Sequence, residues 1–138
     1  MSSFNIFSIA WIAIAVITFC SLFFVVAPYG RHIKEGWGPN ISARLGWVFM
    51  ESPCVILMLG LAIFALEKLN LVHLVFLIIW LSHYVHRTFI WPFKADMLGK
   101  EMPITIALSA FFFNIVNVSI QGYWIFYFVS YSVDWLSS

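Results

Sequence analysis

The segment Leu71–Pro92 reads LVHLVFLIIWLSHYVHRTFIWP, and it decides how the rest of the chain is interpreted. It begins as an apolar run of the kind that crosses a membrane and turns polar from His83 onward. A titratable side chain at membrane depth is costly, so it normally faces a bundle interior or a wet cavity and marks a functional site. Because His83, Tyr84 and Arg87 are spaced three and four residues apart, they share one helical face. The segment predicts a spanning helix with a polar inner face, limited by Pro92.

A simpler interpretation of the polar end also exists. His86 and Arg87 would then mark the end of the helix, with the charged head of Arg87 reaching the lipid headgroups. This accounts for Arg87 better than for His83, which lies one turn deeper. Both interpretations stay open at the level of sequence.

Composition places the whole chain in a membrane. Of its 138 residues, 63% are hydrophobic and 9% are charged, and the mean hydropathy is +0.98. A soluble domain carries about 25% charged residues. Four runs are long enough to span a bilayer, because a span needs about 20 apolar residues; they cover residues 4–27, 43–66, 71–91 and 103–130. We therefore expect an all-α, polytopic membrane helix bundle that forms one transmembrane domain over residues 1–138.

Several other classes of protein do not fit these runs. The first run lacks the basic start and the cleavage site of a signal peptide, so we read it as a retained helix. Cys20 and Cys54 both fall inside apolar runs, which argues against a disulfide framework or a cysteine metal site. A net charge of +1 gives no indication of a nucleic-acid partner, and we expect none.

The basic residues predict the orientation of the bundle. Six of the seven lie in or close to the segments that join run one to run two and run three to run four: Arg31, Lys34, Arg44, Arg87, Lys94 and Lys100. Lys68 alone lies between runs two and three. Since cytoplasmic loops carry the excess of Lys and Arg, both termini are expected on the non-cytoplasmic side of a bacterial inner membrane or the endoplasmic reticulum.

Glu51 is the only acidic residue inside an apolar run. It shares a helical face with Trp47, four residues earlier, and it precedes Pro53, which leaves the carbonyl of Phe49 without its helical partner. Glu51 is either one half of a structural ion pair with Arg87 or a carboxyl group that donates a proton or hydrogen bond in an apolar site. Because intramembrane carboxyl groups are usually functional, we favour the second interpretation.

Two further polar stretches allow a functional and a structural interpretation. Arg31 and His32 either signal topology or contact a phosphate, which the planar fork of Arg fits. In the fourth run, Asn114, Asn117 and Gln121 share one face, and they either join helices by hydrogen bonds or line a site.

A metal centre is disfavoured. A di-iron site needs several histidine clusters, because each iron takes multiple imidazole or carboxylate ligands. The chain has four His, and His32 and His73 are expected on opposite sides of the membrane. We therefore expect no metal.

Over nearly its whole length the chain resembles the steroid 5α-reductase family. Five motifs occur in the order of that family: Pro28-Tyr29-Gly30-Arg31-His32, Trp47 with Met50-Glu51-Ser52-Pro53, His83-Tyr84-Val85-His86-Arg87-Thr88-Phe89-Ile90-Trp91-Pro92, Phe113-Asn114-Ile115-Val116-Asn117, and Gln121-Gly122-Tyr123-Trp124. The third motif is specific. The Glu-x-Pro and Asn-x-x-Asn motifs are common when taken singly.

The resemblance implies a seven-helix membrane oxidoreductase, 3-oxo-5α-steroid 4-dehydrogenase-like, that uses NADPH to saturate the double bond of an enone lipid such as a Δ4-3-oxo steroid. Glu51 and Tyr84 would hold the substrate carbonyl oxygen as catalytic residues. The residues implied to line the substrate pocket are Trp47, Met50, Phe113 and Asn117. The residues implied to face the cofactor are Tyr29, Gly30, Arg31, His32, His83 and Arg87. The implied partners are the hydrophobic substrate and membrane lipid.

The sequence departs from the family in two ways. Ser109 stands where some members have an Arg that supports the catalytic pair. The chain ends after the fourth expected helix, whereas the family places most cofactor-binding residues in three further helices. We expect either a truncated product or a second chain that supplies those helices. The alternatives are a non-catalytic membrane subunit that binds lipid, and a relative of the membrane methyltransferases, against which the shared motifs argue.

Overall fold

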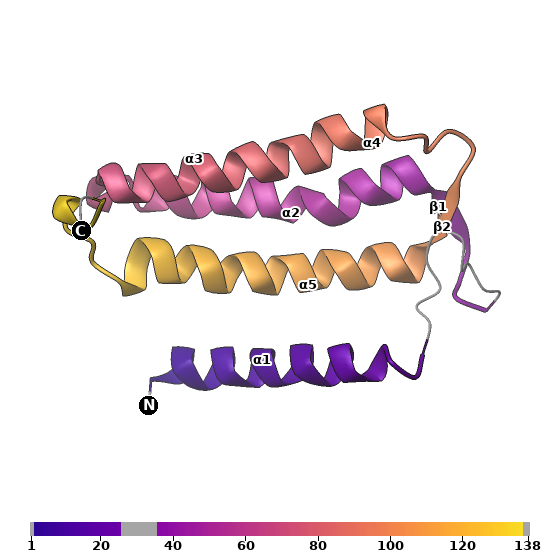
Figure 1. Cartoon of the computed structure of the whole chain (residues 1–138), viewed down its shortest axis with the longest axis horizontal. Coiled ribbons are helices and arrows are strands. Elements are labelled where there is room, and N and C mark those ends of the chain that lie inside the picture. Colours follow the sequence, from indigo (N-terminus) through magenta and orange to yellow (C-terminus); the bar gives the residue numbers. More distant parts are fainter. Residues whose placement is uncertain (1, 26–35, 137–138) are drawn as a thin grey trace.

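The structure is a computed structural model, and it describes residues 2–25 and 36–136. In these residues, four helices are long and apolar enough to cross a membrane, which confirms the expected all-α, polytopic membrane bundle. The helices run alternately up and down, so that the N- and C-terminal ends of the chain lie at the same end of the bundle (Figure 1). The expected arrangement, with both termini on one side, is in agreement with this topology.

Two of the spans are single helices. Helix α1 covers Ser3–Ser21 and α2 covers Ala43–Phe64. The first span was expected to continue through residue 27, but its helix ends at Ser21 and a turn follows. A short 3₁₀ turn, η2 (Leu66–Lys68), leads from α2 toward the third span.

The other two spans each contain a π-helical segment. The third span consists of α3 (Leu71–Val85), the π-helix η3 (His86–Ile90) and α4 (Trp91–Lys94). The fourth consists of α5 (Ile104–Tyr123) and the π-helix η4 (Trp124–Phe128), and a 3₁₀ turn, η5 (Val133–Leu136), follows it. The prediction that Pro92 limits the third helix was wrong, because the backbone stays helical to Lys94.

The structure adds a small two-stranded ribbon that the sequence analysis did not predict. Strand β1 (Asn40–Ser42) pairs antiparallel with β2 (Glu101–Pro103), and Ile41 lies opposite Met102. The backbone N–H of Ile104 donates to the carbonyl of Pro39 and extends this pairing. The ribbon joins the residues before α2 to those before α5 at the end of the bundle opposite the termini (Figure 1).

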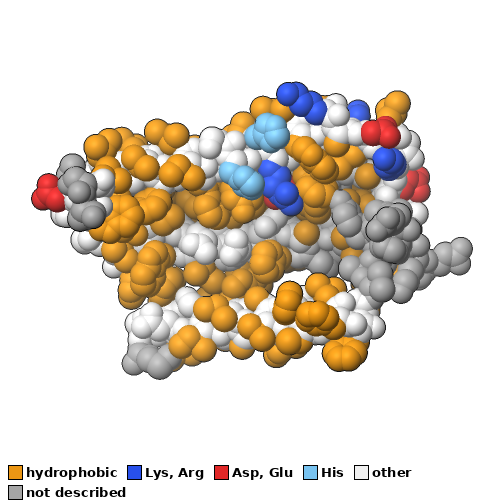
Figure 2. Space-filling view, in the orientation of Figure 1, with side chains coloured by type: hydrophobic (Ala, Val, Ile, Leu, Met, Phe, Trp, Pro, Cys, Tyr) orange, Lys and Arg blue, Asp and Glu red, His pale blue; other side chains and the backbone are white. Residues whose placement is uncertain are grey.

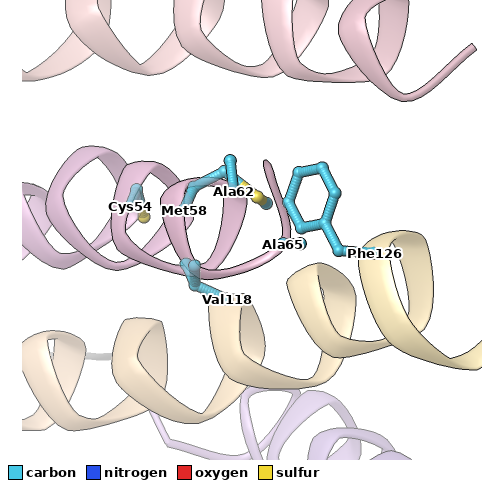
Figure 3. Packing of buried hydrophobic residues seen from close by; sticks show 6 residues of the cluster. All are labelled: Cys54, Met58, Ala62, Ala65, Val118 and Phe126. Atoms are coloured by element: carbon cyan, nitrogen blue, oxygen red, sulfur yellow. The ribbon is translucent and has the colours of Figure 1, made fainter. Parts of the chain in front are cut away.

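The core is packed between α2 and α5, and it extends to the residues that directly follow these two helices (Figure 3). Its buried cluster is made of Cys54, Met58, Ala62, Ala65, Val118 and Phe126. Gly122 allows the close approach, since a Cβ there would lie 2.5 Å from a methyl group of Leu61. The hydroxyl of Tyr127 also donates to the carbonyl of Leu61 at 3.1 Å.

Helix α1 lies beside α5 and has no buried residue. It meets the rest of the bundle through aromatic side chains. Phe4 packs on Tyr123, Trp124 and Phe128, and Trp11 packs on Phe113. The space-filling view shows a hollow between α1 and the other helices (Figure 2).

His73 is buried at the start of α3 and caps that helix. Its Nδ1 atom lies 3.2 Å from the backbone N of Asn70, which donates to it, and Asn70 accepts from the backbone N–H groups of Val72 and His73. The side chain of Asn70 also donates to the carbonyl of Tyr131 at 2.7 Å, which ties the N-terminal end of α3 to the chain after η4.

Candidate functional site

The centre of the candidate site is an ion pair between Glu51 on α2 and Arg87 on η3. The Nε atom of Arg87 donates to Oε1 of Glu51 at 2.8 Å. The Glu51 side chain is 7% exposed, while that of Arg87 is 42% exposed. One partner is therefore buried among the helices, and the other reaches from it to the surface of the bundle.

Trp47 lies on the same face of α2 as Glu51, as its spacing predicted, and it contacts Arg87 in two ways. The guanidinium carbon of Arg87 lies 4.9 Å from the centre of the Trp47 ring. The indole N–H of Trp47 donates to the backbone carbonyl of Arg87 at 3.1 Å. Trp47 also packs on Trp91, with ring centroids 4.5 Å apart. Trp47 thus holds both the backbone and the side chain of Arg87.

Pro92 explains why the carbonyl of Arg87 is free to accept this bond. In a π-helix, each N–H donates to the carbonyl five residues earlier, as the N–H of Trp91 does to His86. Pro92 has no N–H, so the carbonyl of Arg87, five residues earlier, has no backbone donor at that position. The wider turn also lets the helix pass Pro92, which is why the expected end at residue 91 is wrong.

Pro53 has a similar effect inside α2, which stays one continuous helix from Ala43 to Phe64. Pro53 has no N–H that could donate to the carbonyl of Phe49. This carbonyl instead accepts a hydrogen bond from the hydroxyl of Ser52 at 2.8 Å. Around it, three more carbonyls of α2 accept side chains from the neighbouring helices. Asn114 donates to Met50 at 2.7 Å, Thr88 to Glu51 at 3.4 Å and Trp80 to Cys54 at 2.9 Å. The turns of α2 that carry Glu51 are therefore fixed from α5, η3 and α3.

Tyr84 lies on α3 between Trp80 and Arg87 in the sequence, and both of these residues bond to α2. Its ring centroid is 4.6 Å from that of Trp80 and 4.9 Å from that of His83. Its hydroxyl interacts with the thiol of Cys54, and the charges of Glu51 and Arg87 are close enough to act on it. The structure thus gathers Glu51, Tyr84, Trp47 and Arg87 into one region.

His83 and Arg87 line a surface hollow of about 120 Å³ together with His86 and Trp91. Figure 2 shows histidine and basic side chains gathered on this side of the bundle. The sequence analysis considered His86 only as a helix-end residue and missed its place in this hollow. Its spacing from His83, one helical turn, was the available signal. In the part of the chain that the structure describes, no three His, Cys, Asp or Glu side chains gather as metal ligands would.

The residues expected to line a substrate pocket do not all meet. Trp47 and Met50 are buried on α2 beside Glu51. Phe113 is 45% exposed and packs on Trp11 of α1. Asn117 is half-buried and makes no hydrogen bond to the residues described. Among the amide side chains that share one face of α5, Asn114 donates a hydrogen bond to α2. This is the helix-joining role that the sequence analysis considered for these residues.

The first of the predicted cofactor motifs lies outside the described residues. It consists of Tyr29, Gly30, Arg31 and His32, and its cofactor role stays a prediction. Ser109, which stands at the family's Arg position, donates to the carbonyl of Thr105 within its own helix at 2.7 Å.

Comparison with known proteins gives a consistent set of relatives. The chain is 44% identical over 107 residues to Steroid 5-alpha-reductase DET2 of Arabidopsis thaliana, a match that covers 74% of this chain and 41% of the relative. It is 35% identical over 137 residues to the protein of the same name from Solanum lycopersicum, covering 96% and 52%. It is 33% identical over 129 residues to 3-oxo-5-alpha-steroid 4-dehydrogenase 1 of Bos taurus, covering 91% and 50%.

The chain spans about half the length of these curated relatives. No family model matches it.

Proposed function

Because the chain belongs to the steroid 5α-reductase family, we propose that the protein reduces the carbon–carbon double bond of an enone lipid, with a Δ4-3-oxo steroid as the expected substrate. Glu51 and Tyr84 would bind the substrate carbonyl oxygen. The observation that carries the proposal is the common surroundings of these two side chains. Glu51 is buried one helical turn before Cys54, and the thiol of Cys54 interacts with the hydroxyl of Tyr84.

The chemistry requires hydrogen-bond donors at the carbonyl oxygen. When a hydride adds to the β-carbon of an enone, negative charge develops on that oxygen, and fixed donors in a dry pocket stabilise it. The hydroxyl of Tyr84 is one donor. Glu51 would be the second when Oε2 carries a proton, since Arg87 occupies only Oε1 and Oε2 makes no hydrogen bond to the residues described. A proton then returns to the α-carbon of the substrate.

The residues around Arg87 fit the phosphate of a nucleotide cofactor. NADPH, when bound, supplies the hydride. Arg87 uses Nε toward Glu51, its side chain is 42% exposed, and a guanidinium has further donors in a planar fork suited to phosphate. His83 and His86 border the same hollow, and Trp91 offers an aromatic face beside them. We assign the cofactor-facing role to Arg87 and His83, with the Tyr29–His32 motif as the proposed remainder.

For the substrate, we propose a pocket bordered by Trp47 and Met50 on α2 and by Phe113 and Asn117 on α5. The first two residues lie beside Glu51, and a hollow of about 170 Å³ between α2 and α5 is lined by Ser52, Pro53 and apolar side chains. Apolar walls with few polar groups suit a steroid.

A second candidate function is lipid binding without turnover. It is favoured by the groove of about 450 Å³ between α1 and α5, which Phe4, Ser8, Gln121 and Trp124 help to line. In that case Glu51 and Arg87 only join two helices. The shared sequence with reductases along most of the chain favours catalysis.

The test measures single-turnover reduction of a Δ4-3-oxo steroid by the full-length natural protein with NADPH. Tyr84→Phe and Glu51→Met each remove the side-chain donor, since neither Phe nor Met has an O–H or N–H on its side chain. Each is expected to lower the rate about a hundredfold to a thousandfold, the usual cost of losing one donor aimed at an oxyanion. Substrate affinity should change much less. The double variant should lose little more than the slower single variant, because residues that act as one unit are not additive.

Rates are normalised to folded protein, because a structural Glu51 would lower the amount of folded protein and leave turnover per folded molecule unchanged. Near-normal rates in both single variants would refute the assignment. Steroid binding without any turnover in the unmodified protein would favour the second candidate.

A further inference from the structure

Trp80 on α3 touches both Tyr84 and the helix that carries Glu51. Its indole N–H donates to the backbone carbonyl of Cys54 on α2 at 2.9 Å. The Trp80 ring also packs on the Tyr84 ring, since their centroids lie 4.6 Å apart with the rings tilted by 32°. An indole N–H is a donor only, and in a dry bundle it needs an acceptor, so this bond fixes the ring in one orientation.

The acceptor lies close to Glu51 along α2. Cys54 follows Glu51 by three residues and therefore lies one turn away on the same side of the helix. Cys54 is fully buried at one end of the packed cluster of α2 and α5 (Figure 3), and Trp80 and Tyr84 pack against that cluster. The carbonyl that Trp80 uses thus belongs to a rigid part of the bundle.

Tyr84 is held on both sides along its own helix. Four residues before it, Trp80 bonds to the Cys54 carbonyl, and three residues after it, Arg87 bonds to Glu51. The hydroxyl of Tyr84 also interacts with the thiol of Cys54 itself. The segment from Trp80 to Arg87 is therefore attached to α2 at both of its ends, with the phenol between the attachments.

We propose that Trp80 is a positioning residue for the reduction: it holds the Tyr84 phenol against α2 at the distance from Glu51 that lets both side chains reach one carbonyl oxygen. The inference rests on the proposed function and adds a residue to it. Trp80 acts through Tyr84. A donor displaced by about 1 Å can cost about a hundredfold in rate, so a residue without contact to the substrate can control turnover in this way.

Trp80→Phe tests the inference, because phenylalanine keeps an aromatic ring beside Tyr84 and removes the N–H. The matched control is Tyr127→Phe, which removes another side-chain donor to a carbonyl of α2, that of Leu61, at a distance of seven residues from Cys54. Both variants are made in the full-length protein. Melting temperature, the steroid KM and the single-turnover rate with NADPH are measured for each.

The expected result is that both variants lower the melting temperature to a similar extent. Only Trp80→Phe should lower the single-turnover rate per folded molecule, by about 10- to 100-fold, with little change in KM. In a Tyr84→Phe background, Trp80→Phe should lower the rate no further, because its effect passes through the phenol that is already missing.

Three outcomes are distinguishable. A normal rate in Trp80→Phe, with Tyr84→Phe slow, overturns the inference and leaves the proposed function standing. An equal loss of rate from Trp80→Phe with and without the Tyr84 hydroxyl also overturns it. Normal rates in Tyr84→Phe and Glu51→Met overturn the proposed function itself, whatever Trp80→Phe does.

Discussion

Glu51 is the residue on which both structural and chemical interpretations converge. Its carboxylate is buried and paired with Arg87, whose guanidinium also lies over Trp47. Removing one member of a buried pair leaves a charge without compensation, which costs more than the pair itself contributes. The same contact can therefore stabilise the bundle and hold the carboxyl group in place for chemistry.

We predict that Glu51 and Arg87 are thermodynamically coupled. Arg87→Met should lower the free energy of unfolding more in the unmodified protein than in the Glu51→Gln variant, where no carboxylate is left unpaired. The coupling free energy should fall within about 0.5–3 kcal/mol, the range for contacting residues. Thermal unfolding of the four variants in detergent, followed by circular dichroism, gives the value.

The control for this cycle is the ion pair of Lys100 and Asp96. It joins residues four apart at 3.4 Å, with side chains 61% and 90% exposed. Exposed pairs contribute little, so Lys100→Met and Asp96→Asn should be additive within error. Additive effects for Glu51 and Arg87 as well would show that the buried pair does not couple the two helices.

At the scale of elements, two prolines shape the helices that form the site. Pro53 frees the carbonyl of Phe49 inside α2, and Pro92 leaves the carbonyl of Arg87 to the indole of Trp47. Neither proline ends its helix. At Pro92 the replacing donor is Trp47 of another helix, so the missing backbone bond becomes a place where two helices are joined. At Pro53 the replacing donor is Ser52 of the same helix.

We predict that the stability cost of removing the Trp47 N–H depends on the presence of Pro92. Trp47→Phe keeps an aromatic ring under Arg87 but loses the N–H, and it should cost about 1 kcal/mol of stability. In a Pro92→Ala background the cost should fall by half or more, because the restored N–H competes for the Arg87 carbonyl. Chemical unfolding of the four variants measures both costs. An unchanged cost of Trp47→Phe would refute this account of η3.

At the scale of the whole molecule, the bundle has two different ends. One carries the chain termini, η2 and η5, and the other carries the β1–β2 ribbon and α4 (Figure 1). Arg87 belongs to the third span and not to a loop, so it no longer counts as a loop signal for orientation. Of the remaining basic residues that the structure describes, Lys68 alone lies at the end with the termini, and the orientation with both termini on the non-cytoplasmic side stays a prediction.

We predict that Leu98, which precedes β2, faces the cytoplasm and that Glu67 in η2 faces the opposite side. Both residues are exposed. In a Cys20→Ser background, a membrane-impermeant maleimide confined to the non-cytoplasmic side of sealed vesicles should label the Glu67→Cys variant and not the Leu98→Cys variant. Cys54 is fully buried and should stay unlabelled. Labelling of both variants from one side would contradict the topology.

Sequence alone determined the class of the protein and the regions that matter. Four apolar runs suffice to predict four spans, because a bilayer admits only helices or closed barrels. The polar residues Glu51 and Arg87 were singled out for the same reason, since a charge in lipid needs a partner. Their helical spacing also placed Trp47 beside Glu51 correctly. These inferences depend on composition and local periodicity, which the chain carries by itself.

Tertiary structure decided which donor meets which acceptor. Nothing in the sequence around Pro92 indicates that the turn before it is a π-helix. In that turn the carbonyl of Arg87 accepts a hydrogen bond from Trp47, which belongs to another helix. The ribbon of β1 and β2 was likewise invisible, because three-residue strands carry almost no periodic signal. Asn114, and not Asn117, bonds to α2, which depends on how α5 is rotated. Such rotations follow from side-chain packing between helices, and no single helix encodes them.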